Sequence, residues 1–426
     1  MTTLNLYDRP AQGTAARYNL NGMFSNWRRT KRAIGGYHLG SFEVVNLGMP
    51  QLTDFYNTWI GMKIVENTFG ITSYEGIIWQ LDLIKNGVNY RRTLNPNYWH
   101  NNVQVIYTDG PGDKKTIAWS ENINSTEIFG NMEYTMVIGG ASSAGATALR
   151  DRELVDYAWP KSRTVGSVSV GEPSPTLSGD GLYVTTAGFW STANWQYLDT
   201  SITYGASAMM SALASETEII IDGRLETNAL SVTVDGAMIP IRLGDAMENV
   251  IKQGDASGNV WKGGVYADLK LVYEPAPTTI DYILRDGALY DKAGVKVDPA
   301  LINPGFYIRD TNAPMGMQPP GTSNIFDDPQ VSYCDEVEFL WPDTLKLSFP
   351  GESMAIVALG PVWTTQDDPY SLKPRWTPQD DSLSRWTPPP PGPPIGDYGQ
   401  DIGYREDRTY GDGKIRKRGY GDGKER

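Results

Sequence analysis

The chain has little of the chemistry that metal sites and many enzymes use. Its 426 residues include one cysteine, Cys334, and two histidines, His38 and His100. A single cysteine excludes an intramolecular disulfide, and so few sulfur and nitrogen ligands cannot form a zinc site of the usual spacing. No apolar run reaches the roughly 18 residues that a transmembrane helix requires. We expect no metal, no cofactor and no membrane span.

The balance of charge is strongly acidic. Fifty acidic and 37 basic side chains give a formal net charge of −13. Proteins that bind nucleic acid need clustered cations, so we expect no sequence-specific nucleic-acid partner. Residues 1–12 lack the charged-then-apolar pattern of a secretory signal, and we therefore expect synthesis in the cytoplasm.

The two histidines and the cysteine lack a catalytic context. His38 lies in the strand-like "GGYHLGSFEV", and His100 follows a turn in "NPNYWHNNVQV". Neither follows a G-x-S-x-G nucleophile elbow. Cys334 lies in the alternating "QVSYCDEVEFLW", which predicts a small buried apolar residue. We predict no catalytic residue among the three.

One segment is partly similar to a calcium-binding loop, and the composition is compatible with a glycosidase. Residues 255–261, "DASGNVW", place oxygen atoms at alternate positions but lack the sixth-position glycine and closing glutamate of a calcium loop. We predict a hairpin loop there. The 50 acids, with 13 tryptophans and 24 tyrosines, also suit the paired carboxylates and aromatic platforms of a glycosidase, but no pair stands out.

Turn residues are abundant and indicate antiparallel sheet. The chain has 45 glycines and 28 prolines. Asn86-Gly87, Asp235-Gly236 and Asp286-Gly287 each favour a type I′ hairpin turn between alternating segments. The segment 265–273, "VYADLKLVY", alternates apolar and polar residues and predicts one continuous strand.

Helical patterns are scarce. Residues 49–61 predict a short helix with Leu52, Phe55, Tyr56 and Trp59 on one face. Residues 141–159 are alanine-rich and predict a second helix, ended by Pro160 and supported by an Arg152–Asp156 pair. Its expected apolar stripe is Ala141, Ala144, Ala148, Val155, Ala158 and Trp159. We interpret this helix as a connector between two β domains.

A basic segment interrupts the acidic chain. "NWRRTKRAIGGY" contains Arg28, Arg29, Lys31 and Arg32. Two interpretations remain open: a solvated hairpin face, or an electrostatic socket for an acidic partner.

The composition changes near Gln366 to proline, glycine and charge. "RWTP" and "YGDGK" each occur twice, ten residues apart, around the run "TPPPPGPP". Such a segment cannot bury enough apolar surface to offset chain entropy, so we predict that 366–426 is a disordered tail. It could be a passive tail or a docking arm.

Residues 124–160 resemble the signature of tail-hub, or baseplate hub, proteins of tailed bacteriophages. The matching elements are Ser125, Phe129-Gly130, Glu133, the alanine-rich helix at 141–159 and Pro160. Residues 31–83 are similar to the family's opening strand, helix and hairpin, and 184–197 to a segment early in its second domain.

The resemblance implies two tube-like antiparallel β-barrels in each chain, so that three chains mimic a six-fold tail tube. The expected fold is mainly β, with barrels at 1–140 and 161–275 joined by the helix at 141–160. Residues 276–365 would form an additional β domain or insertion. Residues 124–160 should then link two barrels of similar topology.

The resemblance implies a non-enzymatic structural protein of the virion. It would be a tail hub or tail-tip component that forms a homotrimeric ring, with Arg28–Arg32 near a contact. Its partners would be the tail tube and a central spike or fibre. Two alternatives stay open: a receptor- or carbohydrate-binding virion protein, and a hydrolase of cell-wall glycans that uses paired carboxylates.

Overall fold

A computed structural model gives the structure of the chain. It describes residues 2–13, 15–95, 97–110, 114–165, 180–237, 239–311, 330–341, 344–349 and 352–358. The tail predicted at 366–426, with its repeated peptides, lies outside the described residues.

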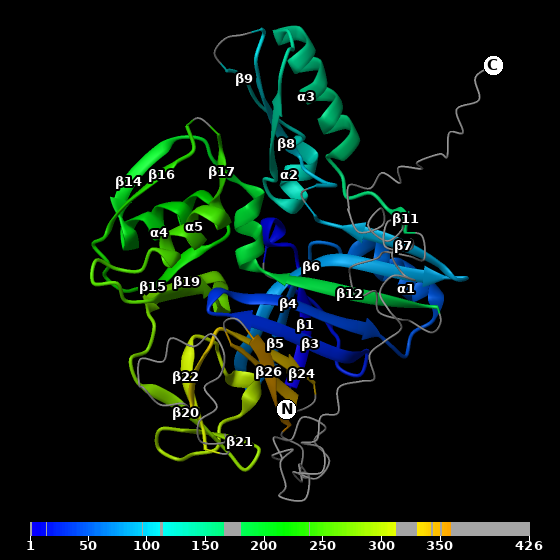
Figure 1. Cartoon of the computed structure of the whole chain (residues 1–426). Helices are drawn as coiled ribbons and strands as arrows, with labels where there is room; N and C mark the ends of the chain where they lie inside the picture. The colour runs from blue at the N-terminus through cyan, green and yellow to red at the C-terminus, as the bar shows by residue number, and fades with distance from the viewer. Residues whose placement is uncertain are drawn as a thin grey trace, which may run out of the picture. The chain divides into compact units, whose positions relative to one another are not determined.

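A 15-stranded sheet occupies the centre of the described chain (Figure 1). Its main path is β2 (Ala16–Asn19), β1 (Thr2–Tyr7), β5 (Lys63–Thr68), β6 (Ile71–Lys85), β12 (Gly181–Gly188), β4 (Ile34–Val44), β3 (Phe24–Arg32), β24 (Glu336–Leu340), β25 (Thr344–Phe349) and β26 (Glu352–Ala358). Two branches leave this path: β7 (Val88–Thr93) and β11 (Arg163–Val165) beside β6, and β18 (Trp261–Val265), β19 (Lys270–Pro275) and β15 (Ile221–Leu225) beside β4.

The chain is mainly β, as predicted, but the two barrels are not formed. None of the sheets in the described residues closes on itself. Strand β12 follows the alanine-rich helix in sequence, yet it pairs antiparallel with both β4 and β6. One core of buried apolar side chains also extends from Leu4 to Tyr273. Residues 1–140 and 161–275 therefore share a sheet and a core, because alternation identifies a strand but not its partner.

A smaller sheet and two helices project from the large sheet (Figure 1). Strands β10 (Glu133–Ile138), β8 (Asn102–Tyr107) and β9 (Lys115–Glu121) form the sheet in that order, with β10 parallel to β8. Helix α3 (Ser143–Tyr157) packs on β8 and β9, and α2 (Ile123–Phe129) precedes β10. We call residues 97–110 and 114–160 the projecting subdomain.

The alanine-rich helix forms within its predicted limits but buries a different face. The Ser142 hydroxyl caps it by accepting the Gly145 N–H at 3.1 Å, and Arg152 pairs with Asp156 at 3.6 Å. Its buried residues are Ala146 and Leu154, whereas Val155 is 78% exposed. The predicted stripe is correct at Ala158, which is fully buried, and at Ala141, which packs against the small core of Val105, Tyr107 and Ala146. It is wrong at Ala144, Ala148, Val155 and Trp159, which are exposed. The helix covers its own sheet and is no spacer between barrels.

The other predicted helix is confirmed. Helix α1 (Met49–Thr58) buries Leu52, Phe55 and Tyr56, and Trp59 follows it in the core. Two further helices, α4 (Ala206–Glu216) and α5 (Leu243–Lys252), pack against each other and were not predicted. Two short strand pairs lie beside these helices: β14 (Ser201–Gly205) with β16 (Ser231–Asp235), and β13 (Tyr197–Leu198) with β17 (Ile241–Arg242). The described 3-10 helices are η1 (Pro10–Gln12), η2 (Phe189–Trp195), η3 (Ala267–Leu269) and η4 (Pro299–Leu301).

Two of the three predicted hairpin turns are confirmed. Asn86-Gly87 and Asp286-Gly287 have positive φ at both positions and join paired strands. Asp235-Gly236 joins no hairpin, since β16 pairs with β14 and β17 with β13. Gly236 is required there because a Cβ would overlap the backbone carbonyl of Leu198.

The strand predicted at 265–273 is a hairpin. Strands β18 and β19 pair antiparallel with Val265 opposite Leu271. The chain reverses through Asp268 and Leu269, whose φ values are 61° and 62°. Alternation continues across this turn, so periodicity alone could not detect it.

The last described region has a core of its own and joins the large sheet. Strands β21 (Ala288–Asp291), β20 (Ile280–Arg285), β22 (Phe306–Asp310) and β23 (Val331–Cys334) form a four-stranded sheet. Strand β24 then pairs with β3. Cys334 is fully buried in this core, as predicted. Among the described residues, every helix is too short or too polar to cross a membrane.

We predict that Gly188→Ala destabilises the fold and that Gly181→Ala, at the other end of β12, does not. A Cβ at Gly188 would overlap the backbone carbonyl of Tyr37, whereas one at Gly181 meets nothing within 4 Å. We expect Gly188→Ala to cost about 3 kcal/mol, and Gly181→Ala less than about 0.5 kcal/mol, in urea-induced unfolding. Equal costs would contradict the placement of β12 between β4 and β6.

Candidate functional site

The basic segment divides between the two faces of β3. Arg29 and Lys31 lie on the same inward face of the strand as Trp27, and each is 1% exposed. Arg28 and Arg32 lie on the opposite, outward face and are exposed. Burial of a cation is costly unless an opposite charge or several acceptors surround it. The inward pair therefore predicts a polar network inside the fold.

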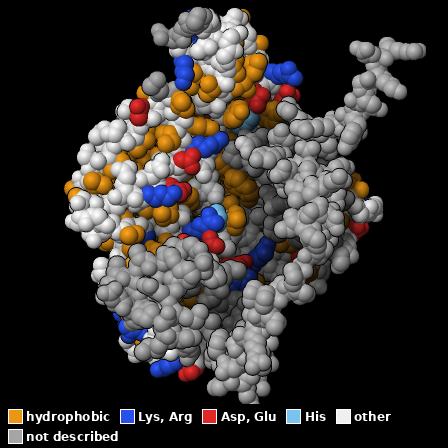
Figure 2. All heavy atoms as spheres, in the orientation of Figure 1, with side chains coloured by type: hydrophobic (Ala, Val, Ile, Leu, Met, Phe, Trp, Pro, Cys, Tyr) orange, Lys and Arg blue, Asp and Glu red, His pale blue; other side chains and the backbone are white. Residues whose placement is uncertain are grey.

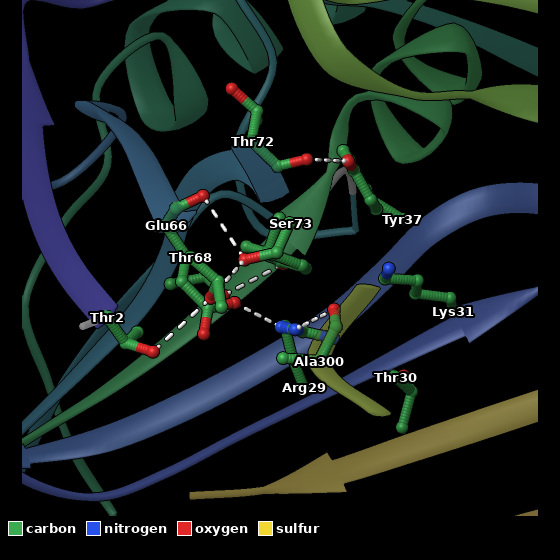
Figure 3. A network of polar contacts seen from close by, with 12 residues as sticks. Thr2, Arg29, Thr30, Lys31, Tyr37, Glu66, Thr68, Thr72, Ser73 and Ala300 are labelled. Atoms are coloured by element: carbon green, nitrogen blue, oxygen red, sulfur yellow. Dashed lines mark hydrogen bonds and ion pairs between the residues drawn. The ribbon is translucent and has the colours of Figure 1, made fainter. Parts of the chain in front are cut away.

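Arg29 forms a buried ion pair with Glu66 of β5, which is completely buried. Figure 3 shows the Arg29 side chain between the Glu66 carboxylate and the backbone of Ala300. An Arg29 N–H donates to the Ala300 carbonyl at 2.7 Å, and the guanidinium lies 4.8 Å from the centre of the Phe339 ring. One side chain thus joins β3, β5, η4 and β24.

Lys31 makes a second connection to the same segment. Its ammonium donates to the Ile302 carbonyl at 3.0 Å and to Asn303 Oδ1 at 2.8 Å, and it lies 5.4 Å from the centre of the Tyr37 ring. Burial lowers the pKa of Lys31 well below its ordinary value, and the nearby positive charge of Arg29 lowers it further. We call Arg29, Lys31, Glu66 and their acceptors at 300–303 the ionic clamp.

The two outward cations, Arg28 and Arg32, also have polar partners within the chain. Arg28 donates to the Ser41 hydroxyl at 2.8 Å, and Arg32 pairs with Glu336 of the adjacent strand β24. On the face in Figure 2, basic and acidic side chains lie next to one another. An electrostatic socket made of all four cations is therefore wrong, because two are internal and a third is already neutralised.

The signature residues of the phage-hub resemblance converge at the base of the projecting subdomain. The buried Ser125 hydroxyl donates to the Ala158 carbonyl at 2.6 Å, as does Trp99 Nε1 at 3.1 Å. Asn101 donates to Ser125 at 3.3 Å and to the carbonyl of Gly130 at 2.9 Å. These contacts fasten α2 and the C-terminal end of α3 to one buried point.

Glu133 connects this base to the segment that follows η2. Its carboxylate accepts the Tyr197 N–H at 2.9 Å and an Asn131 N–H at 3.1 Å. Burial raises the pKa of Glu133 to about 7, and the charges of Asp199 and Glu218 add to the rise, while the two hydrogen bonds oppose it. In the sequence, Glu133 is visible only as part of the hub signature, which assigns it no role.

Each of the two histidines lies in a desolvated environment. His100 is buried between the rings of Tyr134 and Tyr157, with centroids 4.3 and 5.2 Å away, and its Nε2 lies 3.2 Å from Glu153. Burial, helped by the charge of Arg32, lowers the pKa of His38 to about 4.

A cleft of about 1100 Å³ separates the β15–β19–β18 branch from the four-stranded sheet. Its walls carry charges of both signs that bind one another. Glu274 pairs with Arg224 and with Lys262, the latter at 3.3 Å, and Asp281 pairs with Lys292 at 3.1 Å. A polar ligand would have to compete with these pairs. No local pattern in the sequence predicts this cleft, because its walls come from segments that are distant along the chain.

In the loop at 255–261, the candidate calcium ligand Asp255 already accepts hydrogen bonds from the loop itself. Asp255 accepts the N–H groups of Ser257 and Asn259 at 2.9 and 3.0 Å and the Asn259 side chain at 2.9 Å. These hydrogen bonds, the Asn259 side chain first, lower the pKa of Asp255 to about 2. Within the described ranges, no group of three or more His, Cys, Asp or Glu side chains could hold a metal ion.

The chain matches no model of a protein family, and no curated protein matches it.

We predict that Glu66→Gln is strongly destabilising, because it leaves the Arg29 charge buried without a counterion. The expected cost is about 3–5 kcal/mol in urea-induced unfolding. The matched control is Glu336→Gln, which breaks the exposed Arg32 pair and should cost less than about 1 kcal/mol. A similar small cost for both would contradict the ionic clamp.

We predict that Glu133 makes stability fall as pH rises. Its pKa is higher in the folded chain than the ordinary 4.5. The folded state therefore favours the protonated form, whose stabilisation is complete below about pH 4.5 and is lost as pH rises through 7. Glu133→Gln should melt at a higher temperature than the parent at pH 8.5, and this gain should shrink by pH 5.5.

The control for Glu133 is Glu127→Gln, at an exposed position of the same subdomain. The Tm of each chain is measured by calorimetry across the pH range. The difference in Tm from the parent should change with pH for Glu133→Gln and should stay constant for Glu127→Gln. A constant offset across the pH range would contradict the raised pKa.

Proposed function

We propose that the protein is a structural component of a phage tail, a tail hub or tail-tip protein that assembles into a ring and has no enzymatic activity. Its location would be the virion tail, and its partners would be further copies of this chain, the tail tube and a central spike or fibre. The alanine-rich helix does not support this proposal, since it separates no barrels.

The projecting subdomain is the observation that carries the proposal. The residues that match the hub signature are those that fix its base, including Ser125, Gly130 and Glu133. A subdomain held rigidly away from a large sheet can reach a neighbouring copy. Its position is thus suited to setting the geometry of an assembly.

The subdomain also exposes apolar surface that its own fold does not use. Val137 on the edge strand β10, Val155 on α3 and Ile123 at the start of α2 are each more than half exposed. Exposed apolar groups together with an unpaired strand edge are typical of surfaces that become buried on association. Ring closure through such a surface buries the same patch in every copy.

The alternatives have weaker support. The cleft, which Tyr266 and Tyr282 help to line, favours the carbohydrate-binding alternative, because aromatic rings and charged groups together bind sugars. Lys262, Lys292 and Arg224 in its walls are held in ion pairs with carboxylates of the chain, so we place it second. The hydrolase alternative requires an acid and a free carboxylate across a cleft. Glu274 and Asp281 are held by cations, and Asp222 and Asp291 accept hydrogen bonds from the chain itself.

We predict that the purified chain forms a trimer, measured by light scattering coupled to size-exclusion chromatography. Val155→Glu should weaken the trimer without lowering Tm, because Val155 is 78% exposed. The control is Val295→Glu, at another exposed apolar position outside the subdomain. A strictly monomeric parent chain at high concentration would refute the assembly.

A further inference from the structure

The hairpin that joins β5 to β6 has an unusual residue at its tip. Thr68 pairs with Ile71, so the loop consists of Phe69 and Gly70. Their φ values are 53° and 82°. A two-residue loop with positive φ at both positions is a type I′ turn, which normally uses asparagine, aspartate or glycine.

Two other turns of this chain show what the position normally requires. Asn86 and Asp286 occupy the equivalent place in the turns before β7 and β21, with φ values of 53° and 51°. Short polar side chains tolerate this backbone, whereas a bulky side chain with positive φ is strained. Phe69 is therefore an exception within its own molecule.

Among the residues that the structure describes, packing does not compensate this strain. The Phe69 side chain is 68% exposed, and Ile71 beside it is more than half exposed. Leu269 also has a positive φ, but it packs against the main core and its N–H donates to Glu75 at 3.4 Å. A strained and exposed aromatic side chain points to a contact outside the chain.

The surroundings of the tip indicate what it contacts. Residues 67–72, "NTFGIT", carry no charge, and neither do Thr2 and Thr3, which pair with Thr68 and Asn67. The nearest acid in the strand, Glu66, is neutralised internally by Arg29. An anionic membrane would require cations around the ring, and a basic partner would favour an acidic rim. Between two copies of this acidic chain, each with a net charge of −13, like-charge repulsion is weakest where carboxylates are absent.

We infer that the Phe69 tip docks on a second copy of this chain and supplies the second surface of the ring. This inference rests on the proposed assembly and extends it. A ring built from head-to-tail contacts needs two different surfaces on each copy. About nine residues of β6, or about 30 Å of extended strand, separate the tip from Gln80, which pairs with Thr93 just before the projecting subdomain. The tip and the subdomain are thus separate surfaces.

The test replaces Phe69 by the residue that the turn favours. Phe69→Asn removes the aromatic anchor and relieves the backbone, so it should weaken trimer formation by about tenfold or more while leaving the monomer's Tm unchanged or higher. Phe69→Leu retains an apolar side chain and should keep most of the association. Val295→Asn, at a distant exposed apolar position, is the matched control and should have no effect. Association is measured by sedimentation velocity over a dilution series, and Tm at a concentration where all chains are monomeric.

Each outcome has a distinct meaning. Weaker association of Phe69→Asn with an unchanged or higher Tm supports the inference. A parent trimer that Phe69→Asn leaves intact overturns the inference and leaves the proposed assembly in place. A monomeric parent overturns both. A lower Tm for Phe69→Asn overturns the inference, because Phe69 would then stabilise its own fold.

Discussion

The buried ion pair between Arg29 and Glu66 connects parts of the chain that are far apart in sequence. Removing two charges from water costs several kcal/mol for each ion, and only close pairing with additional hydrogen bonds offsets that cost. The Ala300 carbonyl and the Phe339 ring complete the surroundings of the guanidinium. An ion pair depends on direction and fails when a partner is displaced, so it fixes the position of β3 against β5 more strictly than apolar contacts would. The contacts of the same guanidinium with Ala300 and Phe339 hold η4 and β24 beside β3. Hydrophobic packing alone would tolerate small shifts.

Local signals in the sequence gave correct predictions where a few neighbouring residues determine the structure. Asn86-Gly87 specifies its turn through the backbone that both residues tolerate, and the spacing of Leu52, Phe55 and Trp59 specifies α1. Asp235-Gly236 carries the same local signal without forming a hairpin. There the glycine is needed because another backbone segment approaches it, which depends on tertiary structure.

The candidate site was less accessible to prediction, because its partners are distant in sequence. Glu66 occupies an inward position of β5 together with Ile64 and Thr68, and an acid at an apolar position is a signal that a partner cation exists. The identity of that cation is not encoded locally. The basic segment is visible in the sequence, but a count of its charges does not show which of them face inward. Alternate residues of a strand point to opposite faces, so the segment divides between the two sides of β3. The cleft and the base of the projecting subdomain likewise require the fold.

The place of β12 also has a consequence for how the chain is made. A ribosome releases β4 and β6 early, but the strand that lies between them emerges only after the whole projecting subdomain has been synthesised. During that interval the nascent chain holds two long strands with unsatisfied backbone groups facing an empty gap. Completion of the central sheet is therefore a late event in biosynthesis, and early fragments of the polypeptide are the species most exposed to aggregation or to chaperones.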